Sequence, residues 1–160
     1  MKRRVGIIMT VVFSIIGALV LIGGISIAVQ NQKPKIELGL VDGRLKEIPN
    51  KDNAVSTDTA LTEKLVEPLA FKETLLQSKA AMLQALESYG SIEIISDEPA
   101  YIYAVATTGK MKYHDDIEIY FDETDKIIRY RSASRAGYSD MGLNRNRYNE
   151  LTELYNKIED

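Results

Sequence analysis

The sequence contains no cysteine, no tryptophan and only one histidine, His114. Without cysteine the chain forms no disulfide, carries no lipid on a cysteine side chain and builds no cysteine-ligated zinc site. A single histidine also excludes metal sites that need two or three histidine ligands from one chain. We therefore expect no metal and no cofactor, and we assign no residue a catalytic role.

Charged side chains are also missing from the stretch Val5–Val29, which is mostly apolar. A helix needs about 20 apolar residues to cross a bilayer, so this stretch is long enough. Three basic residues, Lys2–Arg4, come directly before it, and such residues mark the cytoplasmic flank. The sequence predicts an integral, single-pass protein of the cell membrane. Residues 1–4 form a cytoplasmic tail, residues 5–29 form the transmembrane helix, and the C-terminal domain is extracytoplasmic.

Two alternatives concern this apolar stretch. Ser26–Ala28 has the small-x-small pattern of a signal-peptide cleavage site, but the apolar region is longer than the roughly 7–15 residues of the apolar region within a signal peptide. Small residues also recur four apart at Gly6, Thr10, Ser14 and Ala18. This spacing allows two membrane helices to pack closely, so the row of small residues is consistent with a homodimer that forms through the transmembrane helix. The alternative is that these small residues simply face lipid.

The part of the chain after the apolar stretch is acidic. The whole chain has a net charge of −3 although its first residues are basic, and an acidic soluble part argues against nucleic-acid binding. The length of this part suits one domain. Residues 30–63 are polar and weakly patterned, so we interpret them as a linker that becomes an ordered loop. Residues 64–160 then form the domain.

Hydrophobic periodicity predicts strands and helices in this domain. The expected strands are Lys64–Phe71, Ser91–Ser96, Tyr101–Thr107, Asp116–Asp122 and Lys126–Ala133, and the expected helices are Glu73–Tyr89 and Asn144–Ile158. The order β-α-β-β-β-β-α predicts an α+β fold, an antiparallel sheet with two helices on one face. It resembles the TATA-binding-protein-like or helix-grip class of folds, a likeness that carries no function. The opposite face of the sheet is expected to lie open.

Acidic residues are concentrated just before residue 125, and arginines follow it. If the last two strands form a hairpin that turns there, Glu118 lies opposite Arg131 and Tyr120 lies opposite Arg129. Both pairs then lie on the sheet face away from the helices. Directly opposed unlike charges stabilise a sheet by roughly 0.2–1 kcal/mol.

The segment Arg131–Arg147 brings hydroxyl groups next to guanidinium groups and leads into a helix N-terminus. Arginine binds carboxylate and phosphate in a bidentate manner, and a helix N-terminus offers free backbone N–H groups. We therefore predict an anion site. Its candidate ligand-binding residues are Arg131, Ser132, Ser134, Arg135, Tyr138, Ser139, Asp140, Asn144, Arg145 and Arg147, and its supporting acids are Asp115, Asp116 and Glu118.

The same side chains have a structural interpretation. Ion-pair networks are common without function, and arginines of this segment are able to hold the loop to the sheet by pairing with nearby acids. Asp115 and Asp116 are adjacent in a strand, so their carboxylates point to opposite faces and do not converge on one metal ion. A hydrolase that uses Asp115 or Asp140 as a base and Arg135 to hold an oxyanion is the weakest alternative, because no complete catalytic set is present.

Four motifs carry a resemblance to a family: GLVDGRL, VEPLAF, DDIEIYFDE and RSASRAGYSDMGLNRNR. They resemble the domain of unknown function 1499 family over about residues 37–158. The resemblance implies a membrane-associated or envelope protein without an established activity. Many relatives have two cysteines in the corresponding loop, and here Ile48 and Ala54 stand in their place. Any role of that cysteine pair is therefore absent, which favours Arg131–Arg147 as the working part.

These observations predict a membrane-anchored binding or interaction module of the cell envelope. The expected partner is an anionic envelope ligand or another membrane protein. A structural subunit of a membrane complex is the main alternative.

Overall fold

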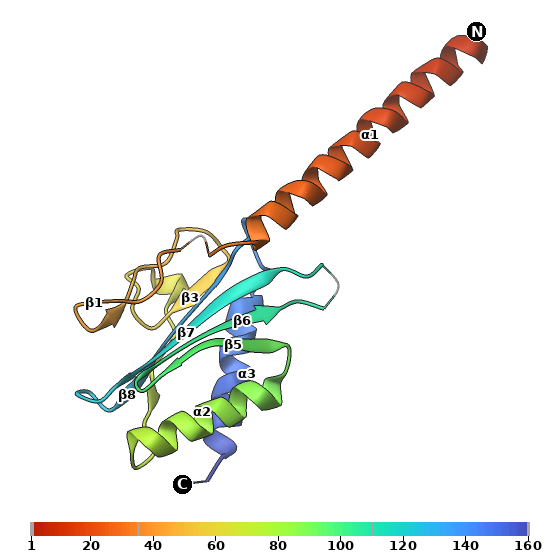
Figure 1. The fold of residues 1–160 in the computed structure, drawn as a ribbon. Helices are drawn as coiled ribbons and strands as arrows, with labels where there is room; N and C mark the ends of the chain where they lie inside the picture. Colours follow the sequence, from red (N-terminus) through yellow and green to blue (C-terminus); the bar gives the residue numbers. More distant parts are fainter. Residues whose placement is uncertain (1, 35, 110, 160) are drawn as a thin grey trace.

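The computed structural model describes residues 2–34, 36–109 and 111–159, and it begins with a long helix, α1 (Lys2–Asn31), which projects from the rest of the chain (Figure 1). Within those residues, one helix is long and apolar enough to cross a membrane, over Arg4–Asn31. A signal sequence near the N-terminus also meets these criteria of length and composition. The structure therefore confirms the apolar N-terminal helix, and its topology in a membrane stays a prediction.

The domain is built on a six-stranded antiparallel sheet with the strand order β3-β8-β7-β6-β5, in which β4 also pairs with β8. The strands are β3 (Ala54–Ser56), β4 (Leu69–Ala70), β5 (Ile92–Glu98), β6 (Tyr101–Thr107), β7 (His114–Asp122) and β8 (Ile127–Ser134). A separate hairpin, β1 (Leu40–Val41) with β2 (Arg44–Leu45), turns at Asp42 and Gly43. Both turn residues have positive φ, as a tight two-residue hairpin requires.

Two helices, α2 (Leu75–Tyr89) and α3 (Leu143–Lys157), cover the same face of this sheet (Figure 1). Alternate residues of the central strands point toward them, and Ile102, Ile117, Ile119 and Phe121 have no exposed surface. They pack with apolar side chains of both helices, such as Leu86. The predicted α+β class is therefore confirmed, because each helix buries its apolar stripe against one side of the sheet.

Two expectations for the N-terminal part of the domain were wrong. Lys64–Phe71 is not one strand: Thr62–Lys64 is a 3-10 helix (η1), and only Leu69–Ala70 pairs with β8. Pro68, which has no N–H to donate to a ladder, lies between them. The segment expected to be a linker and loop also contributes β3, which pairs with the end of β8.

The sheet face away from α2 and α3 is not open, contrary to expectation. The chain before β3 crosses it and contacts its polar residues through the backbone. The N–H of Gly39 donates to Glu118 Oε1 at 2.7 Å, and Arg131 donates to the carbonyl oxygen of Lys46 at 2.6 Å. As a result, Glu118 is only 1% exposed and Arg131 is fully buried. Sequence periodicity misses this cover because it is made by irregular backbone.

Ile48 and Ala54 are both buried in one small apolar cluster with Ala133. The two positions, for which the sequence resemblance implied a cysteine pair in relatives, are thus brought together in the fold. This apolar packing fixes the loop before β3 against the sheet.

Candidate functional site

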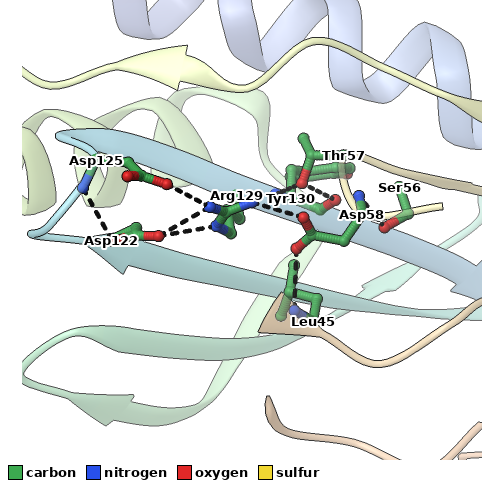
Figure 2. Close-up of polar contacts among 8 residues, drawn as sticks. All are labelled: Leu45, Ser56, Thr57, Asp58, Asp122, Asp125, Arg129 and Tyr130. Carbon is green, nitrogen blue, oxygen red and sulfur yellow. Dashed lines mark hydrogen bonds and ion pairs between the residues drawn. The ribbon is translucent and has the colours of Figure 1, made fainter. Parts of the chain in front are cut away.

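Arg129, on β8, is the centre of an acidic cluster on the outer face of the sheet (Figure 2). Its guanidinium group contacts Asp58 at 2.7 Å, Asp122 at 2.9 Å and Asp125 at 2.9 Å. Burial raises the pKa of Asp122, but hydrogen bonds from the Asp125 N–H, the Arg129 guanidinium and the Thr124 N–H outweigh it and lower that pKa overall. The carboxylate of Asp122 is therefore held as an anion in this cluster.

Arg131 lies two residues further along β8 and forms a buried ion pair with Glu118 of β7, as the predicted register required. Its Nε donates to Glu118 Oε2 at 2.6 Å. The other oxygen of that carboxylate accepts from the hydroxyl of Tyr101 at 2.5 Å. Both charges are thus satisfied within the protein.

Arg135, just after β8, pairs with Asp116 at 2.8 Å and joins the domain to α1. It donates to the carbonyl oxygen of Asn31, the last residue of α1, at 2.9 Å and to the hydroxyl of Tyr103 at 3.0 Å. The Tyr103 hydroxyl itself donates to Asp116 at 2.7 Å. This cluster therefore fixes the end of the apolar helix to the sheet.

The two tyrosines of these clusters predict a loss of stability at alkaline pH. Burial, followed by the hydrogen bond to Glu118, raises the pKa of Tyr101, and burial with the bond to Asp116 raises the pKa of Tyr103 to about 12. The unfolded chain loses such protons near pH ~10. Tyr101 and Tyr103 make their full contribution to the free energy of unfolding below pH ~10. This contribution is lost as the pH rises toward 12.

Urea unfolding of the full chain, followed by circular dichroism between pH 8 and about 12, measures this loss. Tyr103→Phe should make the decline shallower, because one titrating hydroxyl is removed. Tyr138→Phe, at an exposed position, is the matched control and should leave the profile unchanged. Equal slopes for wild type and Tyr103→Phe would contradict the assignment.

On the helix side of the sheet, a second polar cluster joins β7, β8 and α3. Arg147 of α3 contacts Asp115 Oδ2 at 2.6 Å and Asn144 Oδ1 at 2.7 Å. The amide nitrogen of Asn144 donates to Ser134 Oγ at 3.0 Å and to Asp140 Oδ2 at 2.6 Å. Asp115 and Asp116 therefore point to opposite faces and bond to different arginines, as the strand geometry predicted.

The structure separates the predicted anion-site residues into groups. Five of them, with the supporting acid Asp115, share the cluster on the helix side: Ser132, Ser134, Asp140, Asn144 and Arg147. Arg131 and Arg135 lie on the other face with Glu118 and Asp116. Arg145 donates to the carbonyl oxygens of Glu63 and Leu65, and Tyr138 is 67% exposed. Ser139 lies in the connecting loop. The ligand-binding role of this set stays a prediction.

A cavity of about 230 Å³ lies between the β6–β7 loop and the β8–α3 loop. We call it the carboxylate cavity. Its wall includes Thr108, Asp115, Ser134, Ala136, Asp140 and Met141, and none of the described residues that line it is a lysine, arginine or histidine. Asp115 is 1% exposed, and its Oδ1 accepts no hydrogen bond from any described residue. Asp115, a residue of the cavity wall, thus keeps one buried carboxylate oxygen without a hydrogen-bond partner among the described residues.

A second cavity of about 200 Å³ lies beside the same loop and is lined by Lys64, Arg145, Ser139 and Asp140, with Asp52 and Glu63. We call it the lysine cavity. Lys64 is 4% exposed, and its ammonium group lies 3.4 Å from the Pro49 carbonyl oxygen and 3.3 Å from Asn50 Oδ1. It has no carboxylate partner among the described residues. Sequence reasoning missed Lys64, because nothing in the pattern around it distinguishes a buried lysine from a surface one.

Comparison with known proteins gives a family but no characterised relative. No curated protein matches the chain, and no solved structure matches it. One family model matches residues 44–154. This range is well over half of the chain, and it contains the residues of both cavities and the ion pairs that join β7 to β8 and β7 to α3. The chain belongs to the family described as protein of unknown function (DUF1499).

Proposed function

We propose that this protein is a membrane-anchored module of the cell envelope that holds a small ligand with a protonated amine in the carboxylate cavity. The observation that carries the proposal is the buried Asp115, which has one oxygen paired with Arg147 and the other without a partner in the described residues. The basic residues Lys2–Arg4, which come before the uncharged stretch, support an orientation with the domain outside.

The chemistry of the cavity favours a cationic donor. A buried acceptor that lacks a hydrogen bond costs about 1–3 kcal/mol, and a ligand N–H removes that cost. Two carboxylates, Asp115 and Asp140, line the cavity, and among the described residues only Asp115 has an arginine partner. Asp140 instead accepts hydrogen bonds from Gly142 and Asn144 at the start of α3. The uncompensated negative charge therefore suits an ammonium group.

Titration with ethanolamine hydrochloride tests this proposal on the full-length, isotope-labelled chain in detergent micelles. The amide signals of Thr108, Ser134 and Gly137 are expected to shift to saturation, with a Kd near ~1 mM for so small a probe, equivalent to about −4 kcal/mol. Ethylene glycol is the matched probe, because it replaces the amine by a hydroxyl group and should bind at least about tenfold more weakly.

Two variants localise the binding. Asp115→Asn removes the charge but leaves an oxygen that is able to accept from Arg147, and Ala136→Leu fills the cavity without touching the ion pair. Both should abolish saturation by ethanolamine while the remaining amide signals stay in place. Unchanged affinity in both variants, or equal shifts with ethylene glycol, would contradict the proposal.

Lys64 supports a second candidate function, which is binding of an anionic ligand, as the sequence predicted, in the lysine cavity. A buried ammonium without a carboxylate partner is costly, and an anion in the lysine cavity would offset its charge together with Arg145. Inorganic phosphate is the probe in a parallel titration. Saturable shifts at Ser139 and Gly142 that disappear in Lys64→Met would favour this candidate, whereas shifts that persist in Lys64→Met would exclude the lysine cavity.

A further inference from the structure

Three large side chains are exposed on the two loops that border the carboxylate cavity. Met111 is 60% exposed, Tyr138 is 67% exposed and Met141 is 96% exposed. Met111 belongs to the β6–β7 loop, and the other two belong to the β8–α3 loop. An almost fully exposed methionine has no packing role in the described residues. The two loops thus present apolar groups that the fold itself does not use.

The same loops hold the end of α1. The side-chain nitrogen of Asn31 donates to the carbonyl oxygen of Lys112 at 2.6 Å, and its side-chain oxygen accepts from the N–H of His114 at 3.1 Å. Arg135 fixes the Asn31 carbonyl oxygen from the other loop. Asn31 follows Val29, the end of the uncharged stretch, by two residues. The domain therefore has no free linker that would carry it away from the end of this helix.

We propose that the β6–β7 and β8–α3 loops dock on the bilayer surface and insert Met111, Tyr138 and Met141 at the headgroup level. If α1 spans the membrane, its end at Asn31 lies at the interface, and the loops bonded to it lie there as well. Tyrosine favours this zone because one end of its ring is polar. The exposed Lys112 is able to reach lipid phosphates while its alkyl chain stays in the apolar layer.

The proposal rests on the anchor part of the proposed function and not on the amine ligand. It adds a consequence for the carboxylate cavity, because Met141 belongs to its wall. The carboxylate cavity then lies next to the lipid interface.

Single-cysteine labelling tests the docking, and the natural absence of cysteine means that no background site has to be removed. A nitroxide label is placed on Met111→Cys, Met141→Cys, Gly17→Cys or Leu76→Cys in the full chain, reconstituted in phosphatidylcholine and phosphatidylglycerol vesicles. Collision rates with oxygen and with a water-soluble nickel complex then report the depth of each label. Gly17 lies within α1, whereas Leu76 is 79% exposed on α2, which lies away from α1 (Figure 1).

Docking predicts a ratio of oxygen to nickel collisions at positions 111 and 141 that is several-fold higher than at position 76 and lower than at position 17. If position 17 is deep in lipid while 111 and 141 match 76, the docking is overturned and the anchor stands. If position 17 itself matches 76, both are overturned. Low collision rates with both reagents at 111 and 141 would indicate a protein contact, for example with a second copy, and would also overturn the docking.

Discussion

Replacing Arg131 by alanine is expected to unfold the domain or bring it close to unfolding. The variant leaves Glu118, which is 1% exposed, without its cationic partner, and breaking such a buried pair costs about 3–5 kcal/mol. It also removes the donors to the backbone of Glu37 and Lys46, so the chain that covers this face is released. A domain of ordinary stability has only about 5–15 kcal/mol to lose.

The fall in the free energy of unfolding is measured by urea titration of the full chain in detergent. The control is the double variant Glu118→Leu with Arg131→Met, which removes both charges and fills the space with apolar groups. Replacement of both partners is often neutral, so the double variant should be clearly more stable than Arg131→Ala. If the free energy of unfolding of Arg131→Ala lies within about 1 kcal/mol of the wild-type value, the ion pair between Arg131 and Glu118 does not stabilise the fold.

Replacing Arg147 by alanine is expected to have a similar effect from the other side of the sheet. Arg147 is 2% exposed and pairs with Asp115, which is 1% exposed. The expected loss is again about 3–5 kcal/mol, because the buried carboxylate of Asp115 is left without its cationic partner.

Arg147→Lys is the matched control for this prediction. Lysine keeps the positive charge near Asp115 but cannot reproduce the fork that also reaches Asn144. It should therefore recover part of the stability that Arg147→Ala loses. Thermal unfolding of the three proteins at one pH measures both differences. Equal melting temperatures for wild type and Arg147→Ala would contradict a structural role for this ion pair.

Much of the fold was predictable because its signals are local. The alternation of Ile117, Ile119 and Phe121 with polar residues fixed one face of β7, and the turn after it fixed the register that places Glu118 opposite Arg131. Leu151 and Tyr155 marked the buried face of α3. The short strands β3 and β4 escaped prediction, since two or three residues carry no period and join the sheet only through the long edge of β8.

The candidate site was predictable only in part. The segment Arg131–Arg147 does line both cavities, but sequence spacing could not show that Arg131 and Arg135 are bonded to acids on the opposite face. Nor could it show that Asp115 keeps an oxygen without a partner, or that Lys64 is buried. These properties depend on long-range packing of loops, and no local pattern encodes the solvation of a single side chain.

The most direct test is a crystal structure of the full chain at a saturating concentration of ethanolamine. Binding in the carboxylate cavity predicts density for the probe with its nitrogen about 3 Å from Asp115 Oδ1. The pair of Arg147 with Asp115 Oδ2 should remain in place. A carboxylate cavity that stays empty, or a probe that binds elsewhere while Asp115 Oδ1 accepts a hydrogen bond from the protein, would contradict the proposed function.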